Sequence, residues 1–149
     1  MLFRSVDVAV TSKDALLNNQ VGWYGDLDDL AEIVLPACDR AVELARAEER
    51  PNYRDSRGVA LALTGKFPGA MEDFGAVVIW LKTEEEKAEK AKEESSSQAE
   101  KEKHERIATE WKKMRVEREE WIAKLKSGQN PIDNETLKTL RREHVPTSE

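Results

Sequence analysis

The segment from Asn52 to Phe74 limits what this chain can fold into more than any other part of the sequence. Gly58 lies within a run of helix-forming residues, and Gly65 stands where that run stops. A glycine at the end of a helix can adopt the left-handed conformation that closes it, and Pro68 suits the first turn of a following helix. The segment therefore predicts two helices joined by a tight turn.

The ends of these two helices can also be predicted. Asn52 is a good N-cap, because its side chain can accept a hydrogen bond from a free amide of the first turn. We therefore expect the first helix to start at about Tyr53. The apolar pattern after Pro68 predicts that the second helix ends at Trp80 or Leu81.

Small side chains predict a close contact between the two helices. Gly58 and Ala70 carry almost no side chain, so the backbones can approach each other there, and larger apolar residues surround the contact. The pattern resembles the tetratricopeptide (TPR) repeat, in which small, large apolar, turn and aromatic residues recur at fixed offsets along two helices. The residues at these offsets are Gly58, Leu61, Gly65, Phe67, Ala70, Phe74 and Val77.

The match to the TPR pattern is incomplete. Arg54 and Arg57 stand where the family usually has Trp and Leu, and Val77 replaces an alanine. These departures suggest a variant repeat with a more polar first helix. The alternative is an ordinary helical hairpin of an unrelated bundle.

A weaker copy of the pattern precedes this unit. A helix is expected from Asp14 to a stop at Gly25, and a second helix after a cap at Asp28 or Asp29, with a kink or short break at Pro36. The residues that take the repeat positions are Gly25, Leu27, Leu30, Val34 and Ala37. We expect two repeats, of which the first is degenerate.

The composition changes abruptly after Leu81. Charged residues of both signs dominate up to Ile107, and this segment has no apolar face with which to pack, so we expect a solvated arm that is helical or partly disordered. Thr83 is expected to cap it, and Ser95 to Ser97 to interrupt it. The predicted organisation is an irregular lead-in at 1–13, a two-repeat domain at 14–82, the arm at 83–103, a capping helix and a short last helix at 104–142, and a tail at 143–149.

The apolar stripe from Ile107 to Leu125 predicts a helix that covers the open edge of the second repeat. Arg118 interrupts this stripe, and Ser127-Gly128 should end the helix. Asp133 or Asn134 should then cap the last helix. Most of the four tryptophans, Trp23, Trp80, Trp111 and Trp121, are expected in the core. Trp111 and Trp121 are the better candidates for exposed contacts with a partner.

A second resemblance concerns residues 15 to 142 apart from the arm. The segments from Arg54 to Gly58 and from Gly128 to Pro131 are its most specific parts, and they are similar to the TPR region that follows WD-repeat propellers or STAND-type signalling ATPases in large bacterial proteins. No propeller or nucleotide-binding module is present in the sequence. The resemblance implies a non-catalytic scaffold or adaptor of a bacterial signalling system.

Charge and cysteine content restrict the class of protein. With a net charge of −6 the chain has no basic surface for nucleic acid or anionic membranes. The single cysteine, Cys38, excludes an intrachain disulfide and is expected to be buried. No apolar run is long enough to cross a bilayer, and the N-terminal residues do not form a secretory signal. We therefore expect a cytoplasmic protein.

Motifs for catalysis or metal binding are absent from the sequence. No phosphate-binding loop, nucleophile elbow or zinc-ligand spacing occurs, so no enzyme activity, cofactor or metal is predicted. His104 and His144 lie in charged segments typical of an exposed surface. A cation site at Asp26, Asp28 and Asp29 is disfavoured, because capping and solubility explain these residues more simply.

The predicted function is the binding of a protein or peptide in a groove lined by the first helix of each repeat. The groove positions carried over from the TPR pattern are Asn19, Gly22, Asn52, Asp55, Val59 and Ala62. The basic clamp with which some TPR domains hold a C-terminal carboxylate is missing. A homodimer formed through the C-terminal helix is the alternative, and an enzyme is a remote third possibility.

Overall fold

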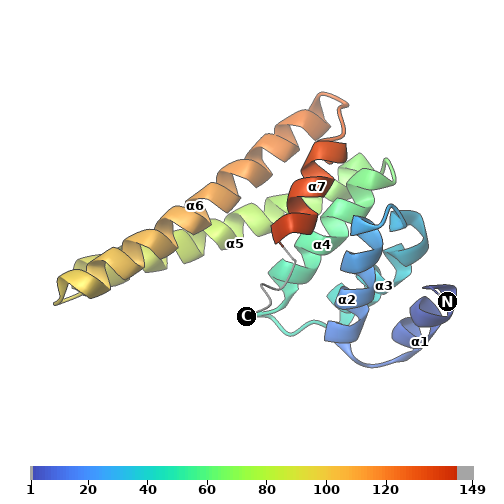
Figure 1. Cartoon of the computed structure of the whole chain (residues 1–149), viewed down its shortest axis with the longest axis horizontal. Coiled ribbons are helices and arrows are strands. Elements are labelled where there is room, and N and C mark those ends of the chain that lie inside the picture. The colour runs from blue at the N-terminus through green and yellow to red at the C-terminus, as the bar shows by residue number, and fades with distance from the viewer. Residues whose placement is uncertain (1, 144–149) are drawn as a thin grey trace.

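The computed structural model describes residues 2–143, and within this range the chain is all-helical, with no strand (Figure 1). This confirms that the fold class is all-α, as the predicted succession of helices required. The helices are α1 (Leu2–Thr11), α2 (Ala15–Leu27), α3 (Ala31–Leu44), α4 (Arg50–Leu63), α5 (Phe67–Glu94), α6 (Gln98–Lys126) and α7 (Asn134–Glu143).

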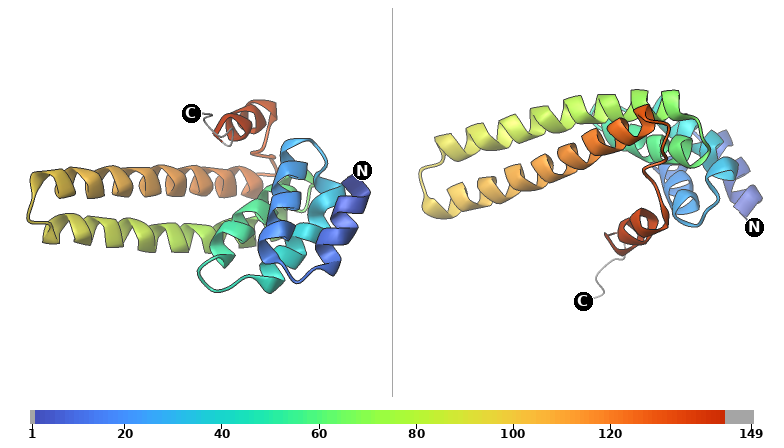
Figure 2. Two further views of the ribbon diagram at one scale, coloured as in Figure 1. Left: turned by 60° about the horizontal axis from the view of Figure 1, so that its bottom comes forward. Right: turned by 90° about the horizontal axis from the view of Figure 1, so that it is seen from above.

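The molecule has a helical body and a long arm. Consecutive helices pack against each other from α2 to α6, and α1 contacts both α2 and α3. The distal halves of α5 and α6 project from the body as an antiparallel pair, as the two views of Figure 2 show. The last helix, α7, returns to the body and lies against α2 (Figure 1).

Several helix ends follow the predicted chemistry. Asp14 caps α2, because its Oδ1 accepts a hydrogen bond of 3.0 Å from the amide of Leu17. Gly65 closes α4 with a φ of +75°, and Gly128 follows α6 with a φ of +79°. Both glycines occupy the left-handed region that a side chain disfavours. Asp133 precedes α7, and its Oδ1 accepts a hydrogen bond of 2.8 Å from the Thr136 amide.

The expected irregular lead-in is wrong, because residues 2–11 form α1. Val6 and Ala9, three residues apart, are buried on the side that packs against the body. The buried Asn18 holds the end of this helix, since its Nδ2 donates to the carbonyl oxygen of Ala9 at 2.7 Å. Tertiary packing on α2 and α3 determines the helical conformation of these residues.

The sequence pattern predicted that α2 ends at Gly25, and this prediction is wrong. The helix continues to Leu27, and the chain then turns at Asp29, which has a φ of +60°. Leu30 precedes α3 without a side-chain cap, so the expected cap at Asp28 or Asp29 is also wrong. Helix α3 runs through Pro36 without a break.

The start of α4 differs by one turn from the expected cap. Helix α4 begins at Arg50, preceded by Glu49 with no side-chain cap, and Pro51 lies in its first turn. Proline is well suited there, because its missing N–H would have no helical acceptor. Asn52 therefore lies inside the helix, and its exposed side chain does not act as an N-cap.

The arm is helical, which was one of the two predicted alternatives, but α5 and α6 also pair in it as a hairpin, which was not predicted. Helix α5 passes through Thr83 as far as Glu94, so Thr83 is not a cap, and Ser95 to Ser97 form the turn into α6. The small residues Ala88 and Ala108 are buried in the arm. Ion pairs add to this contact; the Nε of Arg115 lies 2.7 Å from Glu85 Oε2, and Lys92 Nζ lies 3.3 Å from Glu105 Oε1.

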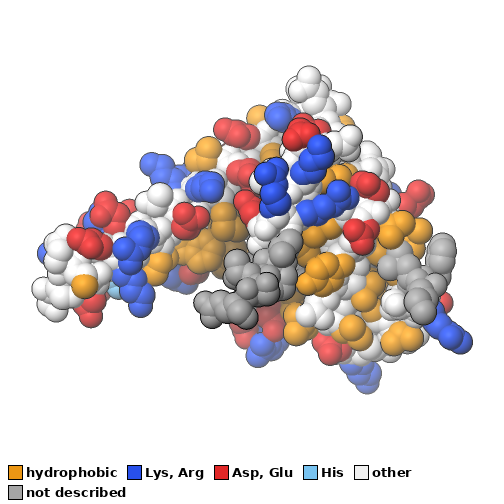
Figure 3. Space-filling model, viewed as in Figure 1, with side chains coloured by type: hydrophobic (Ala, Val, Ile, Leu, Met, Phe, Trp, Pro, Cys, Tyr) orange, Lys and Arg blue, Asp and Glu red, His pale blue; other side chains and the backbone are white. Residues whose placement is uncertain are grey.

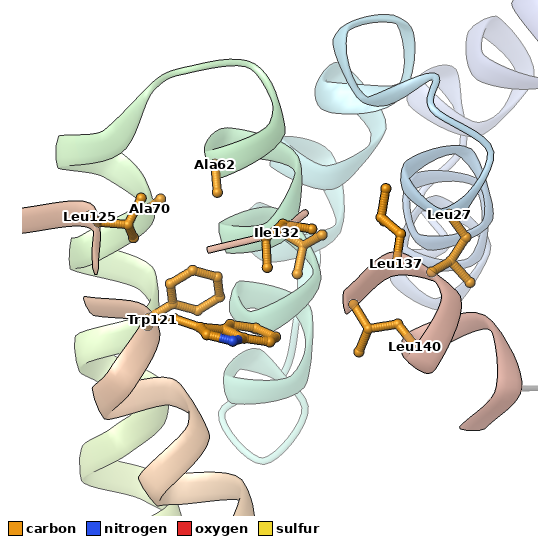
Figure 4. Close-up of a cluster of buried hydrophobic side chains, with 10 residues drawn as sticks. Leu27, Ala62, Ala70, Trp121, Leu125, Ile132, Leu137 and Leu140 are labelled. Carbon is orange, nitrogen blue, oxygen red and sulfur yellow. The ribbon is translucent and has the colours of Figure 1, made fainter. Parts of the chain in front are cut away.

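The main core lies where the start of α5 and the end of α6 join the body. Trp121 of α6 packs edge-on against Phe74 of α5, with the ring centroids 5.2 Å apart. Figure 4 shows Trp121 on one side of Ile132 and the leucines of α2 and α7, Leu27, Leu137 and Leu140, on the other. The buried residues of this cluster are Leu27, Val59, Ala62, Ala70, Phe74, Trp121, Leu125, Ile132, Leu137 and Leu140.

Candidate functional site

A cleft opens on the body where α2, α4, α6 and α7 meet. Its volume is about 370 Å³, and we call it the α2/α4 cleft. The helices contribute polar and aromatic side chains together. The lining residues are Asn19, Gln20, Trp23, Tyr24, Asn52, Asp55, Ser56, Met114, Arg118, Leu140 and Glu143.

Two carboxamides predicted from the sequence do line the α2/α4 cleft. Asn19 comes from α2 and the exposed Asn52 from α4. The Oδ1 of Asn19 is buried and accepts no hydrogen bond from the described residues. A buried acceptor without a donor raises the free energy of the folded protein.

Asp55, also predicted for the groove, is held by an ion pair at the wall of the cleft. The guanidinium of Arg118 contacts both of its carboxylate oxygens, with Nε 2.8 Å from Oδ1 and Nη2 2.7 Å from Oδ2. Arg118 also contacts Glu117 and lies over the ring of Trp121, 4.2 Å from its centroid. The pair ties α4 to α6, and Asp55 cannot bind a ligand freely.

The surroundings of Arg118 keep it charged. Burial acts to lower the pKa of its guanidinium, because the charged form loses water. The charges of Asp55 and Glu117 and their hydrogen bonds act the other way, and the net result is a raised pKa. With only 5% of its surface exposed, Arg118 is a buried cation whose partners are fixed.

Three predicted groove residues lie in the core instead. Val59 and Ala62 are fully buried in the main hydrophobic cluster, because Trp121, Leu125 and α7 cover this side of α4. Gly22 is also buried, and a Cβ on it would meet Cys38 of α3. The prediction that these residues line a groove is wrong: Val59 and Ala62 lie in the cluster that the C-terminal segments complete, and Gly22 packs against α3.

The residues that carried the repeat pattern have packing roles. Gly58 faces the ring of Phe74, where an added Cβ would lie 2.6 Å from Cε1. Gly25 lies in the same way against Val34 of α3. Ala70 and Phe74 are fully buried, and Leu61 and Phe67 are partly buried against the main cluster.

The two arginines that depart from the TPR pattern hold a buried carboxylate. Asp73 of α5 is 1% exposed and is contacted by Arg54 Nε at 2.8 Å and Arg57 Nε at 2.7 Å. The hydrogen bond to Asp73 raises the pKa of Arg57 above its ordinary value, against the effect of burial. This charge cluster links α4 to α5 on the side where the family would have an apolar contact.

Asp26 is buried, although the sequence pattern predicts a solvent-exposed carboxylate. It is fully buried, and neither carboxylate oxygen has a hydrogen-bond partner among the described residues. Burial raises the pKa of Asp26 to about 9. Burial also raises the pKa of Cys38 on α3, and Asp26 and Asp39 add to this effect. Cys38 is therefore a buried thiol, as predicted.

Sequence reasoning missed the aromatic and C-terminal parts of the cleft. Arg118 carried a usable signal, because a charged residue inside an apolar stripe requires a buried partner. Met114 and Leu140 gave no signal, since nothing in their spacing shows that α6 and α7 return to α2. His104 is half-buried on the arm, and His144 lies outside the described residues.

Hydrophobic side chains are exposed where the arm meets the body, whereas charges of both signs mix along the arm (Figure 3). Trp80 and Trp111, both partly buried, stack edge to face at the base of the arm with centroids 5.5 Å apart. Ile79 on α5 is 71% exposed.

Comparison of the chain with models of protein families, with curated proteins and with solved structures found no match. Among residues 2–143, no helix combines the length and the apolar character needed to cross a membrane. The same residues contain no group of three or more His, Cys, Asp or Glu side chains placed to hold a metal ion.

Proposed function

We propose that this protein is a non-catalytic interaction module, a TPR-like scaffold or adaptor that binds a segment of another protein in the α2/α4 cleft. The observation that carries the proposal is the pair of carboxamides, Asn19 of α2 and Asn52 of α4, that line the same cleft. A polypeptide backbone supplies both the N–H groups and the carbonyls that such carboxamides pair with.

The remaining lining of the cleft suits the side chains of a peptide. Tyr24 is 57% exposed, and Trp23 and Met114 lie on the same lining. Aromatic residues and methionine are enriched at the centres of protein interfaces, where they bury large apolar areas. The proposed partner is therefore a protein or peptide that contacts the carboxamides through its backbone and the aromatic residues through apolar side chains.

The proposal extends to the setting of the protein. A net charge of −6 disfavours nucleic acid and anionic lipid as ligands. We place the protein in the cytoplasm, in keeping with its single free cysteine. The resemblance to bacterial signalling proteins suggests a role in such a system.

Selection of peptides from a random library against the full chain tests the proposal. Peptides that bind should lose at least tenfold in affinity when Asn19→Ala and Asn52→Ala are combined, because both carboxamides would lose their bonds to the peptide backbone. Fluorescence polarisation measures the affinity. The melting temperature should stay within a few degrees, since Asn52 is exposed and Asn19 is partly exposed.

The matched control is Gln98→Ala combined with Asn134→Ala, which removes two exposed polar side chains that do not line the cleft. This variant should bind selected peptides as the unchanged chain does. Peptides that bind equally well to the Asn19/Asn52 variant would place the binding surface elsewhere and refute the cleft.

A homodimer formed through the arm is a second candidate function. It is favoured by Ile79, 71% exposed on α5, and Val116, 39% exposed on α6. The pairing of α5 with α6 weighs against it, because much of the apolar stripe of α6 is already buried within the chain. Light scattering at tens of micromolar distinguishes the two, since a monomeric mass removes the dimer and a dimer split by Ile79→Asp supports it.

A further inference from the structure

Helix α7 occupies one side of the candidate cleft, although the sequence pattern assigns that space to a ligand. Leu140 and Glu143 of α7 line the α2/α4 cleft. Figure 4 shows Leu137 and Leu140 pointing towards Leu27 of α2 and Ile132. We call the surface formed by Leu27, Trp23 and Ile132 the α7 seat, because the leucines of α7 pack on this part of the main cluster.

Among residues 2–143, the contacts between α7 and its seat come mainly from two leucines and one arginine. Of the residues of α7, only Leu137 and Leu140 are buried. One further contact comes from Arg141, whose Nε donates to the carbonyl oxygen of Leu27 at 2.5 Å. Pro131 and Ile132 are buried ahead of the helix. The segment that could leave therefore starts at Asp133, and it would leave Ile132 in place.

The seat and α7 are complementary in charge at one end. The C-terminus of α2 carries the negative end of the helix dipole, and Asp28 and Asp29 are exposed beside it. The last turn of α7 is basic, with Arg141 and Arg142, and Arg141 Nη2 lies 3.7 Å from Asp29 Oδ2. A helix that docks here needs two leucines three residues apart and a basic residue directly after the second.

A helix from another protein would have an advantage over α7. With ten residues, α7 is too short to be stable as a free helix, so docking it requires ordering its backbone. A helix that is already folded in a partner does not pay this ordering entropy. The tether gives α7 an effective concentration in the millimolar range, which the partner helix must overcome.

We propose that α7 is a tethered occupant of its seat, and that a partner protein displaces it with an amphipathic helix carrying the same Leu-x-x-Leu-Arg pattern. This inference rests on the proposed function, and it adds the class of partner and the step that opens the cleft. When α7 leaves, Leu27 and Trp23 become available, and the α2/α4 cleft loses the wall formed by Leu140.

The test uses a fluorescent peptide that copies residues 133–143 with a lysine in place of Thr139, held helical by a lactam bridge between Glu135 and this lysine; both positions are exposed in α7. It is titrated against the full chain and against a release variant, Leu137→Asp with Leu140→Asp. The release variant should bind the peptide at least tenfold more tightly than the unchanged chain does, because its own α7 no longer competes for the seat. A peptide with aspartate at both leucine positions should not bind either protein.

A matched control variant carries Asn134→Asp and Thr139→Asp, which add the same charge on the exposed side of α7. It should bind the peptide as weakly as the unchanged chain. Equal binding to the release variant and the control, or no binding to either folded protein, would refute displacement.

Hydrogen exchange on the unchanged chain decides the matter if the release variant does not fold. Millimolar bridged peptide should speed amide exchange in residues 134–143 at least tenfold and leave residues 118–125 of α6 unchanged. Unchanged exchange in α7 at that peptide concentration would overturn the inference. Library peptides that depend on Asn19 and Asn52 but leave α7 exchange unaltered would refute displacement and keep the proposed function. Faster α7 exchange with the bridged peptide, when no library peptide depends on Asn19 and Asn52, would support displacement and refute the proposed function.

Discussion

The pair formed by Arg118 and Asp55 connects parts of the chain that are far apart in sequence, and its two charges are largely removed from water. The Arg118 side chain is 6% exposed and that of Asp55 is 18% exposed. Removing one member of such a pair leaves the other charge buried without compensation, which costs far more than the net contribution of the intact pair. Asp55 is therefore a structural residue of the cleft wall.

Arg118→Ala should lower the free energy of unfolding by about 3 kcal/mol, because Asp55 would lose both of its hydrogen bonds to the guanidinium. Urea unfolding followed by circular dichroism measures the change. Arg40→Ala is the control, since the Arg40–Glu43 pair has a Glu43 side chain that is 68% exposed and should cost less than about 0.5 kcal/mol. A loss at Arg118 no larger than at Arg40 would contradict the buried pair.

Asp26 should make the protein less stable as the pH rises. Its pKa is 3.8 in the unfolded chain and about 9 in the folded protein, so between these values the folded state holds one more proton. The stability from this group is complete below pH 3.8. It is lost as the pH rises towards 9, by about 1.4 kcal/mol for each pH unit.

Asp26→Asn should flatten this pH dependence, because the amide does not ionise. Unfolding by urea at several pH values between about 4 and 9 compares the two proteins, and the variant should gain on the unchanged chain as the pH increases. Asp28→Asn, at an exposed position, is the control and should leave the slope as it is. Parallel profiles for Asp26→Asn and the unchanged chain would show that Asp26 is ionised in the fold.

At the scale of elements, glycines determine how closely the helices approach. Gly58 of α4 meets Phe74 of α5, whereas Gly75 of α5 has no heavy atom within 4 Å of an added Cβ. The two glycines lie inside helices, where alanine is intrinsically favoured by about 1 kcal/mol. The two positions therefore separate the effect of packing from that of helix propensity.

Gly58→Ala should lower the free energy of unfolding by about 1–3 kcal/mol, since the new methyl group would displace the Phe74 ring within a packed core. Gly75→Ala should raise it by about 0.5–1 kcal/mol. Thermal and urea unfolding measure the two effects. If both alanines stabilise the protein, α4 and α5 are not in close contact at Gly58.

Local signals in the sequence were enough to predict some elements and not others. The ends at Gly65 and Gly128 follow from backbone chemistry that the residue itself determines. The extension of α5 to Glu94 could not be predicted from local signals. This part of α5 packs on α6 through small residues such as Ala88 and has no stripe of large apolar residues. Asn19 and Asn52 were found because helix offsets place them, whereas the burial of Val59 depends on segments that return from far along the chain.

At the scale of the whole molecule, the arm makes the protein elongated (Figures 1 and 2). A compact protein of 149 residues would have a radius of gyration of about 15 Å. Small-angle X-ray scattering should give a clearly larger value for the monomer, together with a long tail in the distance distribution. A value near 15 Å would mean that the arm folds back on the body in solution.

The order in which the chain is synthesised gives the covered core a consequence for folding in the cell. Val59 and Phe74 belong to the same buried cluster as Trp121 and Leu137, which leave the ribosome much later. At a synthesis rate of about 5–20 residues per second, the apolar side of α4 and α5 stays exposed for several seconds. During that interval the nascent chain presents an open hydrophobic surface, and a chaperone or a binding partner that arrives then meets no competition from the C-terminal helices.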